Sequence, residues 1–487
     1  MSLCDKDLIS IQEARSLARK AKTAQTILAG FNEADIDKII KNMVKVASEN
    51  AVRLAEMAVE ETGFGKVKDK TIKNRFASEV LYDSIKDMKT IGVIKEDKQK
   101  KVTEIAVPMG VLMGIIPSTN PTSTTIYKSI ISIKSRNGIV FSPHPSALKC
   151  TSEAAILMEE AAVQAGAPEG IIGCITKPSM QGTSELMKAQ EIALIIATGG
   201  SAMVKAAYSA GKPALGVGPG NVPAFIEKTA NIKKAVKNII ASQNFDYGTI
   251  CASEQSIVVE ECIKEEVIEE LKKQGAYFMN SEEIEIVCKA LFTKGFAMNA
   301  QFVGRSPKEI AEKTGIKIPQ GTTVLMGEQK GVGKEYPLSY EKLTTVLAFY
   351  TVEDWKEACE VCMKLLNNGG VGHSISIHTE DDDMVRKFAE KPVFRILVNT
   401  PSSLGGVGAV TGLSPSFTLG CGTWGGSSTS DNVTPMHLIN IKRVAYCIKE
   451  AEDVLGYESK VEVEENTDKI EEIVFKVLKA LNESGEL

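Results

Sequence analysis

Between about residue 108 and residue 400, short runs rich in β-branched residues alternate with longer amphipathic segments. This alternation is typical of repeated strand–helix units, which build a mostly parallel sheet. Because the short runs are almost continuously hydrophobic, we expect strands that are covered on both faces. The predicted strands are 110–116, 138–142, 192–198, 222–227, 255–260, 345–351, 374–378 and 395–399.

The longer segments between the strands have the residue spacing of amphipathic helices. The clearest of them cover residues 146–165, 232–243 and 353–367, and the first 90 residues, approximately, read as consecutive helices with little strand character. The sequence therefore predicts an α/β fold with a helical N-terminal layer.

Composition and charge limit the partners that we expect. Of the 487 residues, 43% are hydrophobic and 24% are charged, as in ordinary globular proteins. No apolar stretch approaches the roughly 18 residues that a membrane-spanning helix needs, and the N-terminus lacks the pattern of a signal peptide. With a net charge of −5 and no basic cluster interleaved with aromatic residues, nucleic acid is not an expected partner. We expect a cytoplasmic protein.

Ten cysteines are scattered through the chain, which predicts reduced thiols rather than disulfides. Cys359 and Cys362 lie in a helical stretch without a second pair at zinc-ligand spacing, so we expect no metal site. Cys251 differs from the others because it lies in a polar, turn-rich link between the helix 232–243 and the strand 255–260. A thiol that is exposed and held rigidly there is suited to act as a nucleophile, whereas core packing is the ordinary alternative.

Two loops that follow predicted strands are candidates for ligand binding. Ala197-Thr198-Gly199-Gly200-Ser201 precedes a helical run over 203–210, so its amides can face a pyrophosphate at a helix N-terminus. Asn120 follows the strand 110–116, and its amide group can stabilise an oxyanion at the carboxyl end of a parallel strand. The alternatives are an ordinary tight loop and an amide that pairs with nearby backbone groups.

The last 40 residues, approximately, form a separate region. Residues 450–472 contain ten acidic residues and two lysines, and 467–487 carries apolar residues at the spacing of one helical stripe, from Ile470 to Leu481. Asp468 with Glu471 is a start signal for this helix, and Gly485 is a stop signal. Either the helix packs on its parent domain, or it is tethered and binds a groove on another protein.

Several uncommon motifs occur in order along the chain and together resemble the aldehyde dehydrogenase superfamily. The resemblance is greatest to its coenzyme A-acylating branch and covers about residues 10 to 447. The motifs are Ile116-Pro117-Ser118-Thr119-Asn120-Pro121, Phe141-Ser142-Pro143-His144-Pro145, Ala197-Thr198-Gly199-Gly200, Gly216-Val217-Gly218-Pro219-Gly220-Asn221, Gly248-Thr249-Ile250-Cys251-Ala252-Ser253-Glu254-Gln255, Arg395-Ile396-Leu397-Val398-Asn399-Thr400-Pro401 and Leu419-Gly420-Cys421-Gly422-Thr423-Trp424-Gly425-Gly426.

This resemblance implies two Rossmann-type parallel-sheet domains, with a nicotinamide cofactor-binding domain over 1–225 plus 418–447 and a catalytic domain over 226–417. It implies that Cys251 attacks an aldehyde to give a thiohemiacetal, while Asn120 and the Cys251 N–H hold the oxyanion. Hydride transfer to NAD, with NADP not excluded, would leave a thioester on Cys251.

The resemblance also implies which residues bind the cofactor. Glu341 resembles the glutamate that binds the nicotinamide ribose, although Thr345 replaces a proline usual there. His144 occupies the region where hydrolytic relatives have an adenosine-ribose lysine. The other expected cofactor-binding residues are Pro117, Ser118, Thr198, Gly199, Gly200, Ser201 and Gly218.

One departure from the hydrolytic pattern favours acyl transfer to coenzyme A. Hydrolytic members carry a water-activating glutamate where this chain has Val217. Without that carboxylate, the thioester should await the thiol of coenzyme A as co-substrate. His373 resembles a histidine typical of the acylating branch and is a candidate base for that thiol, with a buried structural histidine as the alternative.

The implied activity is the reversible conversion of a short-chain aldehyde, NAD and coenzyme A to acyl-CoA and NADH, with acetaldehyde as the expected substrate. The family is usually homo-oligomeric. The tail resembles the encapsulation peptides of bacterial microcompartment enzymes, with 448–466 as an acidic linker and 467–487 as a helix that binds a shell protein. The alternatives are a hydrolytic aldehyde dehydrogenase and a catalytically silent, shell-associated scaffold.

Overall fold

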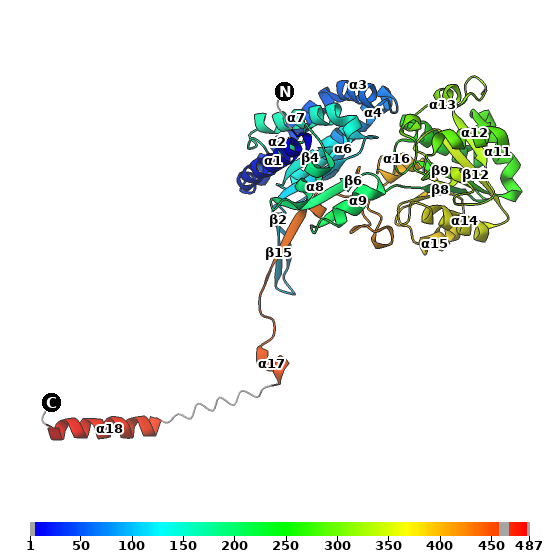
Figure 1. Ribbon diagram of the computed structural model, residues 1–487. Helices are drawn as coiled ribbons and strands as arrows, with labels where there is room; N and C mark the ends of the chain where they lie inside the picture. Colours follow the sequence, from blue (N-terminus) through cyan, green and yellow to red (C-terminus); the bar gives the residue numbers. More distant parts are fainter. Residues whose placement is uncertain (1–4, 457–466, 485–487) are drawn as a thin grey trace. The chain divides into compact units, whose positions relative to one another are not determined.

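The structure, a computed structural model, describes residues 5–456 and 467–484 (Figure 1). The described residues divide into two compact units. The first unit runs to Gly92 and resumes over Ala106–Ile441, and the second contains Val93–Ile105 and the described residues from Lys442 onward.

The first unit begins with consecutive helices, which confirms the predicted helical N-terminal layer. Side chains of Asp5 and Asn32 cap the first two helices by accepting hydrogen bonds from backbone N–H groups. A single π-helical turn, Phe76–Val80, separates the last two helices. The helices are α1 (Lys6–Leu28), α2 (Glu33–Glu49), α3 (Ala51–Thr62), α4 (Val67–Arg75) and α5 (Leu81–Ile85).

A five-stranded sheet follows, in the order β5-β4-β3-β6-β7, and every pairing in it is parallel. Each strand is joined to the next by one helix, as the alternating pattern predicts. The short strands β5 and β7 at the sheet edges were not predicted. The elements are β3 (Val111–Ile116), α6 (Pro121–Lys134), β4 (Gly138–Pro143), α7 (Leu148–Gln164), β5 (Ile172–Cys174), α8 (Met180–Lys188), β6 (Ile192–Thr198), α9 (Ser201–Tyr208) and β7 (Ala214–Val217).

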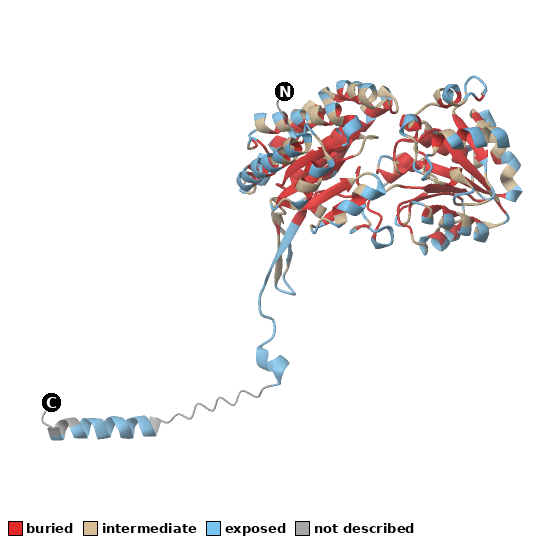
Figure 2. Ribbon diagram, viewed as in Figure 1, coloured by how far each residue is buried: buried red, intermediate tan, exposed pale blue. Residues whose placement is uncertain are grey.

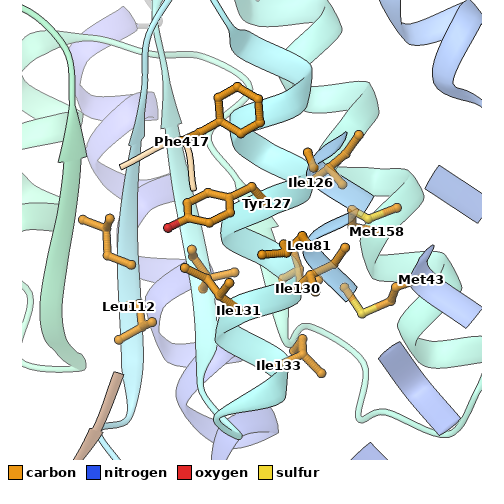
Figure 3. Close-up of a cluster of buried hydrophobic side chains, with 14 of the residues drawn as sticks. Met43, Leu81, Leu112, Ile126, Tyr127, Ile130, Ile131, Ile133, Met158 and Phe417 are labelled. Carbon is orange, nitrogen blue, oxygen red and sulfur yellow. The ribbon is translucent and has the colours of Figure 1, made fainter. Parts of the chain in front are cut away.

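The core of this part lies between the sheet and the N-terminal helices. Figure 3 shows isoleucines of the fully buried helix α6 between Leu112 of β3 and two methionines, Met43 of α2 and Met158 of α7. The Tyr127 ring meets the ring of Phe417 at 6.2 Å between centroids. Sequentially distant segments therefore share one core, which fixes the position of α6 and of the loop that precedes it.

The chain then enters a seven-stranded parallel sheet in the order β10-β11-β12-β9-β8-β13-β14. Strand β8 (Val222–Ile226) pairs with β9 and β13, so the change of sheet falls between Val217 and Val222, inside the range predicted for the cofactor-binding domain. The other strands are β9 (Glu254–Glu260), β10 (Ala276–Phe278), β11 (Val324–Glu328), β12 (Val346–Val352), β13 (Ile375–His378) and β14 (Ile396–Val398). The sequence pattern did not predict β10 and β11.

Helices cover the seven-stranded sheet, and Figure 2 shows the strands of both large sheets almost wholly buried. These helices are α10 (Ile232–Asn244), α11 (Lys264–Lys273), α12 (Ser281–Leu291), α13 (Pro307–Thr314), α14 (Trp355–Asn367), α15 (Asp382–Ala389) and α16 (Ser402–Gly406). The two parallel sheets with their helices confirm the predicted Rossmann-type α/β class.

The second unit contains most of a three-stranded sheet and the C-terminal helices. The sheet has the order β1-β2-β15, formed by β1 (Gly92–Asp97), β2 (Val102–Pro108) and β15 (Ile439–Ala445). After it come α17 (Ala451–Leu455) and α18 (Thr467–Ser484), the helix predicted for the tail. The predicted stop at Gly485 and most of the acidic linker, 457–466, lie outside the described residues. None of the helices within the described ranges is both long and apolar enough to cross a membrane.

Packing around α6 predicts a position-dependent loss of stability. Ile130 on α6 is fully buried, whereas Ile156 on α7 is 48% exposed. We expect Ile130→Ala to lower the free energy of unfolding by about 2–5 kcal/mol, because it leaves a cavity, and Ile156→Ala to lower it by less than about 1 kcal/mol. Chemical denaturation followed by circular dichroism measures both changes, and equal losses would contradict the described packing.

Candidate active site

A cavity of about 430 Å³ collects most of the predicted site residues. The loops that follow β3, β4, β6 and β7 line it from the carboxyl edge of the five-stranded sheet. Residues 249–251, ahead of β9, and Glu341 and Leu343, ahead of β12, line it from the amino edge of the seven-stranded sheet. The predicted residues that line the cavity are Cys251, Asn120, Pro117, Ser118, His144, Thr198, Gly199, Gly200, Gly218 and Glu341. Ser201 and His373 are not among the lining residues.

Cys251 lies between a tight turn, η3 (Phe245–Gly248), and β9, and its side chain is half-buried at the cavity wall. Burial and, next, the nearby Glu341 carboxylate raise the pKa of the Cys251 thiol to about 12, while Arg395 acts in the opposite direction. These surroundings favour the protonated form of the thiol at neutral pH.

Glu341 faces the same space. The Gly220 N–H donates a 2.8 Å hydrogen bond to Glu341 Oε1, and burial raises the pKa of this carboxyl to about 8. Among the described residues that line the cavity, Glu341 has the only carboxylate. Near neutral pH it is mostly protonated, which limits its repulsion of a thiolate on Cys251.

Asn120 lies immediately ahead of α6, and its amide group is held on both sides. Lys73 Nζ donates to Asn120 Oδ1 at 2.7 Å, and Asn120 Nδ2 donates to the Thr249 carbonyl at 3.0 Å and to Thr119 Oγ1 at 3.2 Å. The amide nitrogen is thus directed toward the loop that carries Cys251. Donation to an oxyanion requires that one of its two present hydrogen bonds be exchanged.

The sequence reasoning missed the charged residues behind Asn120. Lys70 and Lys73 of α4 are 3% and 2% exposed at their side chains, and both bind Asp246 Oδ2, whose side chain is fully buried. On the sequence, the lysines of α4 look like an ordinary solvated helix face. The one available signal was that Asp246 lies in the same turn-rich link as Cys251.

The glycine loops fit a dinucleotide. A Cβ at Gly199, Gly200 or Gly218 would meet no atom within 4 Å, so the backbone there borders open space. Thr198 Oγ1 is buried without a hydrogen-bond partner in the described part of the chain, and α9 begins after Gly200 without a side-chain cap. Free N–H groups and an unpaired hydroxyl beside open space suit a phosphate ligand.

The two predicted histidines differ in placement. His144 is exposed at the cavity rim, where its Nδ1 lies 2.8 Å from Ser146 Oγ. His373 is fully buried, its Nδ1 lies 3.0 Å from Ser374 Oγ, and Nε2 has no partner within residues 5–456. Burial, with Arg395 nearby, lowers the pKa of His373 to about 3. A Cβ on Gly220 would collide with the Cys251 carbonyl and lie 3.0 Å from the His373 ring, so Gly220 separates the two.

The nine described cysteines are free. Nowhere in 5–456 or 467–484 do three or more His, Cys, Asp or Glu side chains gather as they would around a metal ion. Among its described lining residues, the cavity presents one thiol, one amide and one carboxyl group, together with several hydroxyl groups and the His144 imidazole.

The sequence model of the aldehyde dehydrogenase family matches residues 3–332, more than half of the chain. The chain belongs to the aldehyde dehydrogenase family. Over 454 residues it is 45% identical to the bifunctional aldehyde-alcohol dehydrogenase AdhE of Escherichia coli K12. The match covers 92% of this chain and 50% of that protein. The chain thus spans about half the length of the first curated relatives that it matches.

Solved structures agree with this aldehyde dehydrogenase fold. An acetylating aldehyde dehydrogenase from Geobacillus thermoglucosidasius is 55% identical, with a TM-score of 0.90 and coverage of 92% of this chain and 99% of that chain. A propionaldehyde dehydrogenase from the Clostridium phytofermentans fucose utilisation bacterial microcompartment is 28% identical, with a TM-score of 0.81 and coverage of 90% and 99%.

The electrostatics of this aldehyde dehydrogenase cavity predict a pH-dependent effect of Glu341. Above its pKa of about 8 the carboxylate opposes the Cys251 thiolate, and below that value it is neutral. We expect Glu341→Gln to speed alkylation of Cys251 by iodoacetamide about 3- to 10-fold at pH 9.5 and to change it little at pH 6.5. Peptide mass spectrometry of the Cys251 peptide measures both rates. An equal effect at the two pH values would exclude a charge effect.

Proposed function

We propose that this protein converts a short-chain aldehyde and coenzyme A to acyl-CoA through a thioester on Cys251, with a nicotinamide as the hydride acceptor. The observation that carries the proposal is the cavity itself, which brings together the Cys251 thiol, the Asn120 amide and open glycine loops. The relatives with solved structures, an acetylating aldehyde dehydrogenase and a propionaldehyde dehydrogenase, support the same reaction class. Acetaldehyde is the aldehyde that we propose first.

The reaction begins at the thiolate. Cys251 Sγ attacks the carbonyl carbon, a C–S bond forms, and the carbonyl oxygen becomes an oxyanion. Asn120 Nδ2 and the Cys251 N–H are the proposed donors to it, and Nδ2 gives up its hydrogen bond to Thr119 or Thr249 to reach it. The nicotinamide supplies the hydride acceptor when it is bound. Loss of hydride leaves a thioester on Cys251.

The cavity wall favours a thiol over water as the next nucleophile. Val217, which replaces the glutamate expected in hydrolytic members, is 2% exposed and lines the cavity. An aliphatic side chain accepts no proton from water, so the thioester persists. Attack by the coenzyme A thiolate forms the acyl-CoA bond and releases Cys251 as the leaving thiolate.

The cofactor residues are proposed from the fit of the loops. Thr198, Gly199 and Gly200 would hold the pyrophosphate with Ser201 at the start of α9, and Pro117, Ser118 and Gly218 would flank the nicotinamide. Glu341 would bind its ribose, and His144 would line the outer end of the groove. NAD is the proposed cofactor, and a direct comparison with NADP decides between them.

His373 stays a candidate base for the coenzyme A thiol, but the geometry gives that role little support. The ring does not line the cavity, and a pKa of about 3 makes it a weak proton acceptor near neutral pH. If His373→Ala transfers the acyl group to coenzyme A as fast as the unchanged protein, its role is structural.

Dependence on coenzyme A tests the reaction. With aldehyde and NAD alone, we expect about one equivalent of NADH for each Cys251, followed by a stall, because the thioester lacks an acceptor. Addition of coenzyme A should restore continuous NADH formation, and Cys251→Ala should abolish both phases. Stopped-flow absorbance at 340 nm measures them, and steady turnover without coenzyme A would favour the hydrolytic alternative. A Cys251 that resists iodoacetamide and gives no NADH with any aldehyde would favour the silent scaffold.

We further propose that the catalytic part is a homo-oligomer. We also propose that α18 directs the enzyme to a bacterial microcompartment shell. The α18 side chains of Ile470, Ile473, Val474 and Leu478, which share one helical stripe, are 50–63% exposed. Figure 2 colours the described residues of α18 as exposed. The microcompartment origin of the propionaldehyde dehydrogenase relative supports this role.

Removal of the tail separates targeting from chemistry. Deletion of 467–487 should leave the coenzyme A-dependent activity within about twofold, because the cavity lies elsewhere in the chain. It should abolish co-sedimentation with purified shells, and so should the double change Ile473→Asp and Leu478→Asp. Lys476→Ala, on the polar side, is the matched control. Loss of activity on deletion would favour a helix that packs on its parent domain.

A further inference from the structure

We propose that Lys73 and Asp246 are positioning residues for the oxyanion site: together they fix the Asn120 amide and the Thr249–Cys251 segment relative to each other. The proposal rests on the thioester chemistry proposed above and deepens it. The group that we call the buried ion cluster consists of Lys70, Lys73 and Asp246, none of which lines the cavity.

Lys73 donates all three of its ammonium protons in hydrogen bonds. Its Nζ donates to Asn120 Oδ1 at 2.7 Å, to Asp246 Oδ2 at 2.5 Å and to Thr249 Oγ1 at 3.0 Å. One ammonium group therefore joins the loop after β3 to the turn ahead of Cys251. As an ammonium, Lys73 has no lone pair and no unbonded proton, so it acts by position.

The Asp246 carboxylate accepts hydrogen bonds from several groups of this network. Its Oδ2 accepts from Lys70 Nζ at 2.9 Å and Thr249 Oγ1 at 2.7 Å as well as from Lys73, and its Oδ1 accepts from the Lys66 N–H at 2.7 Å. Although burial opposes ionisation, Lys73 and Lys70 lower the pKa of Asp246 to about 2. Asp246 therefore stays ionised at neutral pH, and burial lowers the pKa of Lys73 to about 8, so Lys73 is mostly an ammonium there.

The backbone is arranged to permit this contact. Asp246 has φ of 52°, in the left-handed region that few non-glycine residues adopt. Gly65, with φ of 74°, faces it, and a Cβ there would collide with the Asp246 carboxylate. Lys70 adds a second link, since its Nζ donates to the Thr119 carbonyl at 2.9 Å. The chain accepts local strain to hold Asp246 at this point.

Two consequences for the reaction follow. An ammonium can only donate, so contact with Lys73 forces the Asn120 oxygen toward α4 and the nitrogen toward the Cys251 loop. The hydrogen bond from the Lys73 ammonium to the Asn120 amide oxygen also makes the amide N–H groups stronger donors, because hydrogen bonds in a chain polarise one another. Loss of Lys73 would leave Asn120 free to rotate its amide and would weaken it as a donor.

Two reagents that modify Cys251 distinguish positioning from a general structural role. p-Nitrophenyl acetate acylates the thiolate through a tetrahedral oxyanion: a C–S bond forms, the C–O bond breaks and p-nitrophenolate leaves. Iodoacetamide alkylates the same thiolate by displacement of iodide, without an oxyanion. We expect Lys73→Met to slow acylation about 10- to 100-fold and alkylation less than about 3-fold. The p-nitrophenolate burst at 400 nm and mass spectrometry of the Cys251 peptide measure the two rates.

A double-mutant cycle ties the effect to Asn120. Asn120→Ala alone should slow acylation at least as much as Lys73→Met, and adding Lys73→Met to it should change the rate less than about 3-fold, because the two residues act as a unit. Lys68→Met, an exposed position on the same helix, is the matched control and should leave both rates unchanged. Lys73→Arg keeps the charge and the donors and should retain acylation within about 10-fold.

Equal slowing of both reagents by Lys73→Met, or independent effects in the cycle, would overturn the proposal. If Lys73→Met does not fold, Lys70→Met, which removes the hydrogen bonds to Asp246 and to the Thr119 carbonyl, gives the comparison, and a loss limited to acylation supports positioning. Neither reagent needs a nicotinamide or coenzyme A. The proposed function fails instead if the unchanged protein forms no NADH from any aldehyde with coenzyme A, and the two reagent rates still decide the role of Lys73.

Discussion

Strand direction is the constraint on which the site depends. In the five-stranded sheet every strand runs parallel, so the loops after β3, β4, β6 and β7 all emerge at one edge. The seven-stranded sheet offers its amino edge to the same cavity, through the segments ahead of β9 and β12. One cavity can therefore contain both a set of glycine loops and a nucleophile, although they are far apart in the sequence. The thiol precedes a strand of the seven-stranded sheet and the glycine loops follow strands of the five-stranded sheet, so each sheet contributes a different part of the cavity wall.

Buried ionisable groups have different charge states at the cavity and in the ion cluster behind it. At the cavity, burial favours neutral groups, because it raises the pKa values of Cys251 and Glu341. A few residues away, Asp246 stays ionised because two ammonium groups surround it. The carboxylate of Asp246 is thus kept in the scaffold, where it fixes geometry, and out of the cavity, where a negative charge would oppose a thiolate.

Much of this arrangement could be predicted from the sequence, and the remainder has definite physical reasons. Long, continuously apolar strands such as β6 and β9 were predicted within a residue or two, because their pattern is strong. Strands β5 and β10 have three residues each, too few to show a period. Cys251 was found through its polar, turn-rich surroundings. Lys73 and Asp246 were missed because a buried ion pair between distant segments leaves no local pattern, and the lysines of α4 resemble a solvated face.

The tail presents a different balance of forces from the catalytic part. Helix α18 has 18 residues, and among its described side chains Lys476 and Glu472 form an ion pair. Most helical stability in proteins comes from the packing of an amphipathic face, whereas such an ion pair adds about 0.5 kcal/mol or less. Its exposed residues Ile473, Val474 and Leu478 contribute hydrophobic stabilisation only when another surface covers them. Burial of these side chains against another surface would therefore stabilise the helix and the contact together.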